Sequence, residues 1–186
     1  TIYSAAELKD LHEACREYGL YLFLDGARLG YGLAASDNDL TLPLLAKYTD
    51  VFYIGGTKVG ALFGEAVVIS SETLKKDFRY IMKQKGGLLA KGRLLGIQFD
   101  TLFTDGLYFE IAARANRYAE EIREAMRKKG YIFLASNHTN QIFVEMPDRD
   151  LEVLGERFVY SYDRRVDDTH SLVRFCTSWA TKEGNV

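Results

Sequence analysis

Residues 51–62 (VFYIGGTKVGAL) place one lysine among glycines and small apolar residues, directly after an apolar run of strand length. Nothing charged lies between Val51 and Lys58, and the next carboxylate is Glu65. Because an ammonium group is costly to remove from water, a buried setting of this kind would favour the uncharged amine. An uncharged lysine is suited to forming a Schiff base with a carbonyl compound. The alternative is a turn at the end of a strand whose lysine extends into solvent.

Composition and charge exclude several other classes of function. The chain has 186 residues, of which 47% are hydrophobic and 27% charged, and its net charge of −2 gives no field that would attract nucleic acid or an anionic membrane. Cys15 and Cys176 stand alone, which indicates a reducing compartment such as the cytoplasm. No apolar run is long enough to span a bilayer. His12, His138 and His170 lack the spacing of metal ligands, so we expect no metal site.

The first third of the chain has the pattern of an α/β domain. Ser4 and Glu7 have the spacing of a capping box, and Gly19 stands where a helix would end. Residues 20–24 then form a continuous apolar run, which predicts a strand buried on both faces. A short helix at residues 42–48 and a strand at residues 51–54 follow.

Two polar side chains follow these two strands. Asp25 comes directly after the first strand, and Lys58 comes shortly after the second. Since about one βαβ unit separates them, both are predicted to lie at the same edge of one sheet. An isolated Asp-Gly turn is the alternative interpretation for Asp25. Residues 66–69 form a third apolar run that follows too soon for a crossover helix, so we expect it to pair antiparallel.

The second part of the chain predicts helices followed by short strands. Ser71 begins a predicted basic amphipathic helix that stops at Gly86 and Gly87, and its cations are interpreted as a solvated face rather than a polyanion site. A long helix is expected from Asp105 to Gly130. After it we predict strands at 131–134 and 141–145, a helix at 148–158, and a hairpin of 159–162 with 172–177.

Three segments together resemble a known family. They are FLDGARL at residues 23–29, GTKVGA at residues 56–61 and GEAVV at residues 64–68. They are similar to segments of the low-specificity threonine aldolases, which are β-eliminating lyases that use pyridoxal phosphate. The resemblance implies an α/β fold: part of the large domain of fold type I, with a mostly parallel sheet and helices, followed by a small α+β C-terminal domain. We place the large-domain part at residues 1–105, and the long helix and small domain at residues 106–186.

The resemblance also implies roles for individual residues. Lys58 would form the Schiff base with the cofactor, and Asp25 would keep the pyridine nitrogen protonated so that the ring accepts electrons. Arg28 would lie near the phenolic oxygen of the cofactor. Thr57 is a candidate for contact with the phosphate, with closure of the turn as the alternative. Arg174 would bind the α-carboxylate of an amino-acid substrate, with an exposed strand arginine as the alternative.

The sequence also departs from the family pattern. Leu89 and Ala90 stand where threonine aldolases have an Arg-Gln pair. The phosphate-binding glycine loop and the histidine that stacks on the cofactor have no counterpart here, so we expect a fragment of a longer enzyme. The implied reaction is cleavage of threonine or allo-threonine to glycine and an aldehyde in a homo-oligomer. The alternatives are another reaction of the same cofactor, such as β-elimination or transamination, and a catalytically inactive interaction module.

Overall fold

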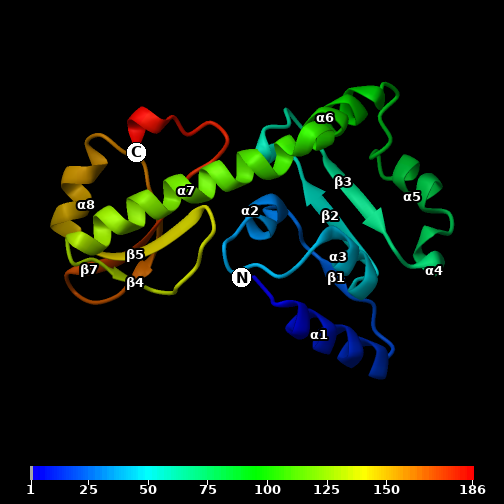
Figure 1. The fold of residues 1–186 in the computed structure, drawn as a ribbon, viewed down its shortest axis with the longest axis horizontal. Coiled ribbons are helices and arrows are strands. Elements are labelled where there is room, and N and C mark those ends of the chain that lie inside the picture. Colours follow the sequence, from blue (N-terminus) through cyan, green and yellow to red (C-terminus); the bar gives the residue numbers. More distant parts are fainter. Residues whose placement is uncertain (1) are drawn as a thin grey trace. The chain divides into compact units, whose positions relative to one another are not determined.

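The computed structural model describes residues 2–186 of the chain. They divide into two compact units, one that ends at Ile111 and one that comprises Ala112–Val186, and these are described separately below. Figure 1 labels the helices α1–α8 and all of the strands except β6. Among the described residues, no helix is both long enough and apolar enough to cross a membrane.

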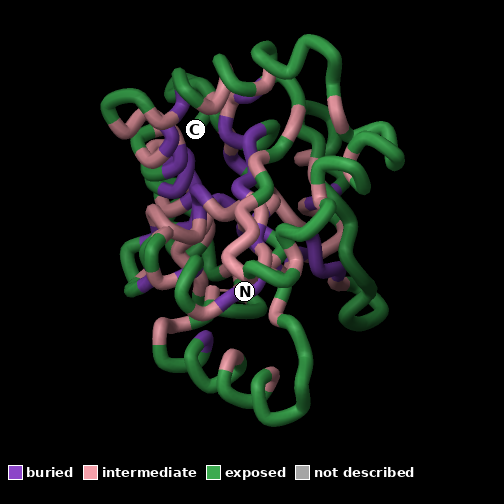
Figure 2. Tube along the Cα trace, turned by 90° about the vertical axis from the view of Figure 1, so that its right-hand side faces the viewer, coloured by how far each residue is buried: buried purple, intermediate pink, exposed green. Residues whose placement is uncertain are grey.

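Helix α1 (Ala5–Glu17) begins with the predicted capping box. The Glu7 N–H donates to Ser4 Oγ at 3.2 Å, and the Ser4 N–H donates to Glu7 Oε2 at 2.8 Å. Gly19 has a φ of +65°, the left-handed conformation that closes a helix. Leu8 is the one buried residue of α1, which is otherwise largely exposed (Figure 2).

A three-stranded sheet in the order β1-β2-β3 forms the centre of the first unit. Strands β1 (Phe23–Leu24) and β2 (Val51–Gly55) are parallel, and β3 (Glu65–Ile69) is antiparallel to β2. The antiparallel prediction for this third strand is therefore confirmed, as is helix α3 (Leu42–Tyr48).

The prediction that residues 20–24 form a strand buried on both faces is wrong for the described chain. Only two of these residues are in β1, which is an edge strand of the sheet, and the Phe23 side chain is 58% exposed. A continuous apolar run does not specify how many neighbours a strand has, because that depends on the rest of the sheet.

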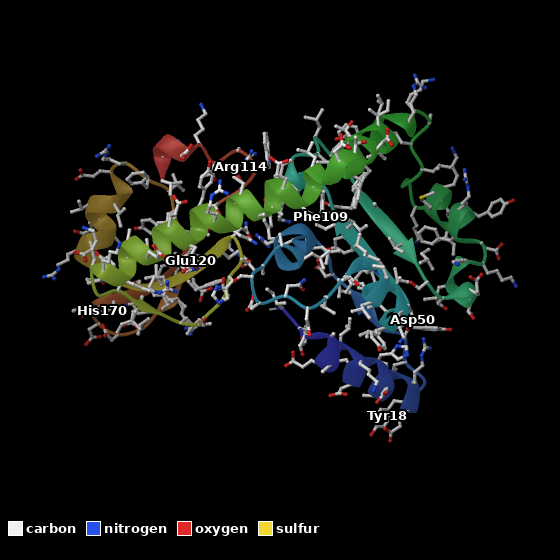
Figure 3. All side chains as sticks on the ribbon, in the orientation of Figure 1. Tyr18, Asp50, Phe109, Arg114, Glu120 and His170 are labelled. Carbon is white, nitrogen blue, oxygen red and sulfur yellow. The ribbon has the colours of Figure 1, made fainter. Side chains whose placement is uncertain are left out.

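A buried aspartate anchors the chain before β2. The carboxylate of Asp50, labelled in Figure 3, accepts from Arg16 Nη2 and from the Leu22 N–H, both at 2.8 Å. Asp50 is only 2% exposed, so these donors replace the water that its charge has lost. The contact holds the end of α1 and the start of β1 against the start of β2.

The basic segment after Ser71 is two helices rather than one. Helices α4 (Glu72–Lys75) and α5 (Phe78–Gln84) are separated at Asp77, whose φ is +58°. The prediction of one continuous helix is thus wrong. Two further helices had no predicted counterpart, α2 (Leu29–Leu33) and α6 (Arg93–Phe103).

The long helix α7 (Leu107–Lys128) confirms the prediction and continues into the second unit. A four-stranded antiparallel sheet in the order β4-β5-β7-β6 forms that unit. Its elements are β4 (Ile132–Phe133), β5 (Gln141–Pro147), α8 (Asp148–Gly155), β6 (Ser161–Arg165) and β7 (His170–Cys176). The predicted hairpin therefore forms, although its first strand lies a few residues later than expected. The core of this unit contains Ala119, Ile142, Val144, Met146, Leu151 and Val173.

Candidate active site

Asp25 and Lys58 follow the carboxyl ends of two neighbouring parallel strands. Asp25 comes directly after β1, and Lys58 lies in a 3₁₀ turn (Thr57–Val59) that follows β2. Ligands of open α/β sheets bind at this edge. The side chain of Lys58 is exposed in the described chain. The burial that the apolar neighbourhood suggested is therefore not provided by residues 2–186.

Two buried tyrosines fix the backbone around the lysine. Tyr31 Oη donates to the carbonyl oxygen of Lys58 itself. Tyr108 Oη donates to the Gly55 carbonyl oxygen at 2.9 Å and accepts from the Gly30 N–H at 3.0 Å. Both tyrosines are 0% exposed, and burial raises the pKa of Tyr108, so its hydroxyl remains a donor. The lysine thus projects from a loop whose carbonyl groups are held in place.

Glu65, the first residue of β3, accepts hydrogen bonds from the two residues that precede Lys58 in the loop. Its carboxylate accepts from the Gly56 N–H at 2.6 Å and from Thr57 Oγ1 at 3.4 Å. The hydroxyl of Thr57 therefore has a role in closing the turn, which was the alternative to phosphate contact. Phosphate binding by Thr57 stays a prediction.

The glycines of this edge permit backbone segments to approach closely. A Cβ on Gly26 would lie 1.7 Å from the Tyr53 carbonyl oxygen, and one on Gly55 would lie 2.3 Å from the Ala27 carbonyl oxygen. No side chain fits at either position without moving the backbone. The glycine of the sequence DGAR (residues 25–28) thus permits close packing of two strand ends, in addition to the chemical roles predicted for Asp25 and Arg28.

One oxygen of the Asp25 carboxylate accepts two hydrogen bonds, and the other accepts none from the described residues. Asp25 Oδ1 accepts from Tyr53 Oη and from the Ala27 N–H, the latter at 3.0 Å. No described residue donates to Oδ2. The hydrogen bond from Tyr53, followed by that from Ala27, lowers the pKa of Asp25 below its usual value. An ionised carboxylate with one unused oxygen matches what a protonated ring nitrogen requires.

Two arginines of the predicted site also have unused donors. Arg28 precedes α2, and its Nε is buried without a hydrogen-bond partner. Arg174 lies in β7, in the second unit, where its Nη2 donates to Ser161 Oγ at 3.4 Å and its Nε is buried without a partner. A buried N–H without an acceptor is costly, so the described residues do not fully satisfy either guanidinium.

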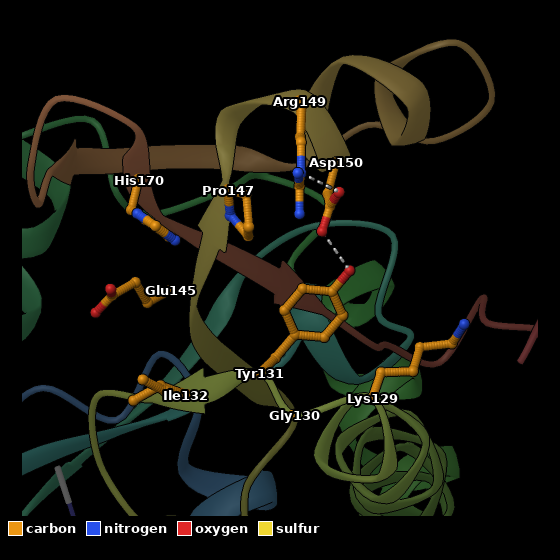
Figure 4. A pocket seen from close by; sticks show the side chains of 9 residues that line it. All are labelled: Lys129, Gly130, Tyr131, Ile132, Glu145, Pro147, Arg149, Asp150 and His170. Atoms are coloured by element: carbon orange, nitrogen blue, oxygen red, sulfur yellow. Dashed lines mark hydrogen bonds and ion pairs between the residues drawn. The ribbon is translucent and has the colours of Figure 1, made fainter.

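A separate pocket of about 240 Å³ lies within the second unit (Figure 4). Tyr131 Oη donates to Asp150 Oδ2 at 2.8 Å on its wall. Its residues are Lys129, Gly130, Tyr131, Ile132, Glu145, Pro147, Arg149, Asp150 and His170. None of the predicted site residues lines it.

Two residues of this pocket, Glu145 and His170, have potential ligand atoms within 4.8 Å of one another and of Asp167. The Asp167 carboxylate already closes the turn before β7, accepting from the Thr169 N–H at 2.7 Å and the His170 N–H at 2.8 Å. The first of these bonds is the main cause that lowers the pKa of Asp167 to about 2. This local role accounts for the cluster, and we assign no metal to it.

Comparison with known proteins places the chain in a family. Residues 1–149 match the beta-eliminating lyase family, and the chain belongs to it. The chain is 33% identical over 193 residues to a low-specificity L-threonine aldolase of a Pseudomonas species, covering 100% of this chain and 53% of that protein. For the enzyme of the same name from Pseudomonas aeruginosa, identity is 30%, with coverage of 94% and 55%. The chain thus spans about half the length of the curated relatives it matches.

Solved structures confirm the fold. The threonine aldolase of Leishmania major is 42% identical, with a TM-score of 0.96, covering 98% of this chain and 54% of that one. A putative L-allo-threonine aldolase of Listeria monocytogenes has a TM-score of 0.74 at 15% identity, which supports the fold alone. The family and the fold type I architecture indicated by the three sequence motifs are confirmed.

Proposed function

We propose that this chain is part of a pyridoxal-phosphate-dependent lyase that cleaves threonine or allo-threonine to glycine and an aldehyde. The observation that carries the proposal is that Lys58 and Asp25, whose Oδ2 has no donor among the described residues, follow the carboxyl ends of neighbouring parallel strands at one edge of the sheet. The names of the relatives support the aldolase reaction.

The residues at this edge suit the cofactor. Lys58 would bind its aldehyde carbon, Asp25 its ring nitrogen and Arg28 its phenolic oxygen. Thr57 would contact the phosphate with the hydroxyl that now donates to Glu65. The bound cofactor would supply an electron sink for the pair released when the Cα–Cβ bond breaks.

Protein side chains would do the remaining work of binding and orientation. Asp25 stays ionised because two donors stabilise its charge, so it would hold a proton on the ring nitrogen rather than remove it. Arg174 would bind the substrate carboxylate through the planar fork of its guanidinium group. The base that accepts the proton of the substrate hydroxyl is not assigned to any residue of this chain.

Location and assembly form part of the same proposal. Both cysteines, Cys15 and Cys176, are free, which supports a cytoplasmic enzyme. We propose a homo-oligomer, because Lys58 is exposed here and a reactive lysine is favoured by a site that excludes water. Light scattering of the full protein would measure the oligomeric state.

The family's name gives one competing reaction. Beta-eliminating lyases, as named, release a β-substituent instead of breaking the Cα–Cβ bond, and membership alone does not distinguish the two. Only the aldolase reaction forms glycine from threonine. Quantifying glycine after incubation of the full protein with threonine, allo-threonine or serine would separate them.

The first experiment tests the lysine. The full protein is loaded with pyridoxal phosphate, reduced with borohydride and mapped by peptide mass spectrometry. We expect one stable adduct on Lys58, complete loss of that adduct in Lys58→Ala, and an unchanged adduct in the control Lys83→Ala, an exposed lysine of α5. Modification scattered over surface lysines would contradict the proposal and favour a catalytically inactive module.

A further inference from the structure

We propose that Tyr53 is a positioning residue for the cofactor-binding aspartate: its hydroxyl holds Oδ1 of Asp25 and leaves Oδ2 for the ring nitrogen. This inference rests on the proposed function. Tyr53 stands outside the three motifs that carry the family resemblance.

The sheet register brings the two residues together. Phe23 pairs with Val51 and Leu24 with Phe52 across the parallel strands. The next position of this register sets Asp25 beside Tyr53. Neighbours in register on parallel strands direct their side chains to the same face, so the phenol reaches the carboxylate. Tyr53 Oη accordingly donates to Asp25 Oδ1.

Packing fixes the direction of the phenol. The rings of Phe23 and Tyr53 have centroids 5.9 Å apart, and the Tyr53 carbonyl oxygen lies against Gly26. The tyrosine is therefore held by its ring and by its backbone. A donor held in this way restricts rotation of the carboxylate and leaves Oδ2 without a donor among the described residues.

The charges around the pair favour an ionised aspartate. Tyr53 is the main cause of the lowered pKa of Asp25, and the Ala27 N–H and the nearby charges of Lys58 and Arg28 act in the same direction. The reciprocal effect raises the pKa of Tyr53 to about 12, with smaller contributions from burial and from Glu65. The phenol thus remains protonated and can donate throughout the neutral range.

This hydrogen bond predicts the direction in which the pKa of Asp25 changes in the variant Tyr53→Phe. Without the hydroxyl, the pKa of Asp25 rises, so the aspartate of the cofactor-free protein becomes protonated at a higher pH. A protonated aspartate cannot pair with a protonated ring nitrogen. Cofactor affinity should therefore begin to fall at a higher pH in the variant than in the wild type.

The test measures binding of pyridoxal phosphate to the full protein by fluorescence titration, over a range of pH. For Tyr53→Phe we expect the dissociation constant to rise about tenfold at neutral pH, because the carboxylate is no longer held in one orientation. We also expect the acid limit of the affinity profile, the pH below which affinity falls, to move to higher pH. Carbon-13 NMR of the cofactor-free protein should show the Asp25 carboxyl titrating at a higher pH in the variant.

Two further variants separate the hydroxyl from packing. Phe23→Leu keeps the hydroxyl but removes a ring contact that helps to hold it, so it should move the acid limit of the affinity profile less than Tyr53→Phe does. The control Tyr80→Phe changes a tyrosine that is 79% exposed and should leave the acid limit unchanged.

The outcomes distinguish this inference from the proposed function. A Lys58 adduct together with wild-type affinity and an unshifted acid limit in Tyr53→Phe would overturn the role of Tyr53 and leave the enzyme intact. Absence of a wild-type adduct on Lys58 would overturn the proposed function and this inference with it. A Lys58 adduct with the shifted profile would support both.

Discussion

At the scale of single residues, Arg123 shows how a buried charge organises the second unit. Its side chain is 3% exposed and donates to Glu120 Oε2 at 2.5 Å, Asn137 Oδ1 at 3.1 Å and the Gln141 carbonyl oxygen at 3.3 Å. It also donates to the Thr139 carbonyl oxygen. The guanidinium therefore ties α7 to the loop that leads into β5.

Removing this arginine should be costly, because its acceptors would stay buried without donors. We expect Arg123→Met to lower the free energy of unfolding by about 3 kcal/mol, measured by urea denaturation. The control is Arg117→Met, which removes an exposed pair with Glu121 at 3.8 Å and should change stability by less than about 0.5 kcal/mol. Equal effects of the two variants would refute the role assigned to Arg123.

The placement of Asp25 and Lys58 at one edge of the sheet is the most predictable feature of the candidate site. Asp25 and Lys58 were identified because strand endings in an α/β pattern bring polar residues to one edge. The sequence does not identify Tyr53, because inside an apolar run a tyrosine indicates only a strand. It does not identify Tyr31 and Tyr108 either, because their partners are backbone groups far away in the sequence. The register between β1 and β2 was the signal that points to Tyr53.

At the scale of elements, the sequence predicts the start or end of a helix where the hydrogen bonds that form it join residues close together in the chain. Ser4 and Glu7 specified the start of α1, since each satisfies a backbone donor of the other. The end of helix α7 is equally predictable, because Gly130 marks the stop. The break at Asp77 was not, because an aspartate seldom adopts a positive φ and no glycine marks the site. Strand β1 was overestimated, because its burial depends on neighbouring strands.

The two serines at helix starts give a matched test of capping. Ser4 Oγ accepts a backbone hydrogen bond, whereas Ser71, the N-cap of α4, makes no side-chain cap bond. We expect Ser4→Ala to destabilise α1 by about 1 kcal/mol, so that its amides exchange with solvent about fivefold faster. Ser71→Ala should leave exchange in α4 unchanged. Hydrogen exchange with mass spectrometry measures both, and no acceleration in α1 would be the contrary result.

The contribution of the Ser4–Glu7 cap to stability depends on pH, and the pKa shift of Glu7 gives the direction. The Ser4 N–H, followed by the Ser4 hydroxyl, lowers the pKa of Glu7. A lowered pKa in the folded state means that the contribution to stability is complete above the ordinary glutamate pKa and is lost as the pH falls through the lowered value. The difference in exchange between Ser4→Ala and the wild type should therefore shrink in acid.

At the scale of the whole molecule, the chain combines two units of different character. The first unit has exposed apolar side chains around β1, including Tyr18, Leu20, Tyr21 and Phe23. In the second unit, β5 is paired on both sides, and its own residues Ile142, Val144 and Met146 are buried in the core. A self-contained core is what allows a segment of this size to fold by itself.

We therefore expect residues 107–186, produced alone, to unfold in one cooperative transition. Thr177 Oγ1 donates to the Ala115 carbonyl oxygen at 2.7 Å, which closes the unit between α7 and the end of β7. Ile142→Ala should lower the free energy of unfolding by about 3 kcal/mol, since it leaves a cavity at a fully buried position. Val159→Ala is the matched control, because Val159 is 99% exposed. Circular dichroism during heating measures all three, and a wild-type segment without a cooperative transition would show that the core depends on the rest of the chain.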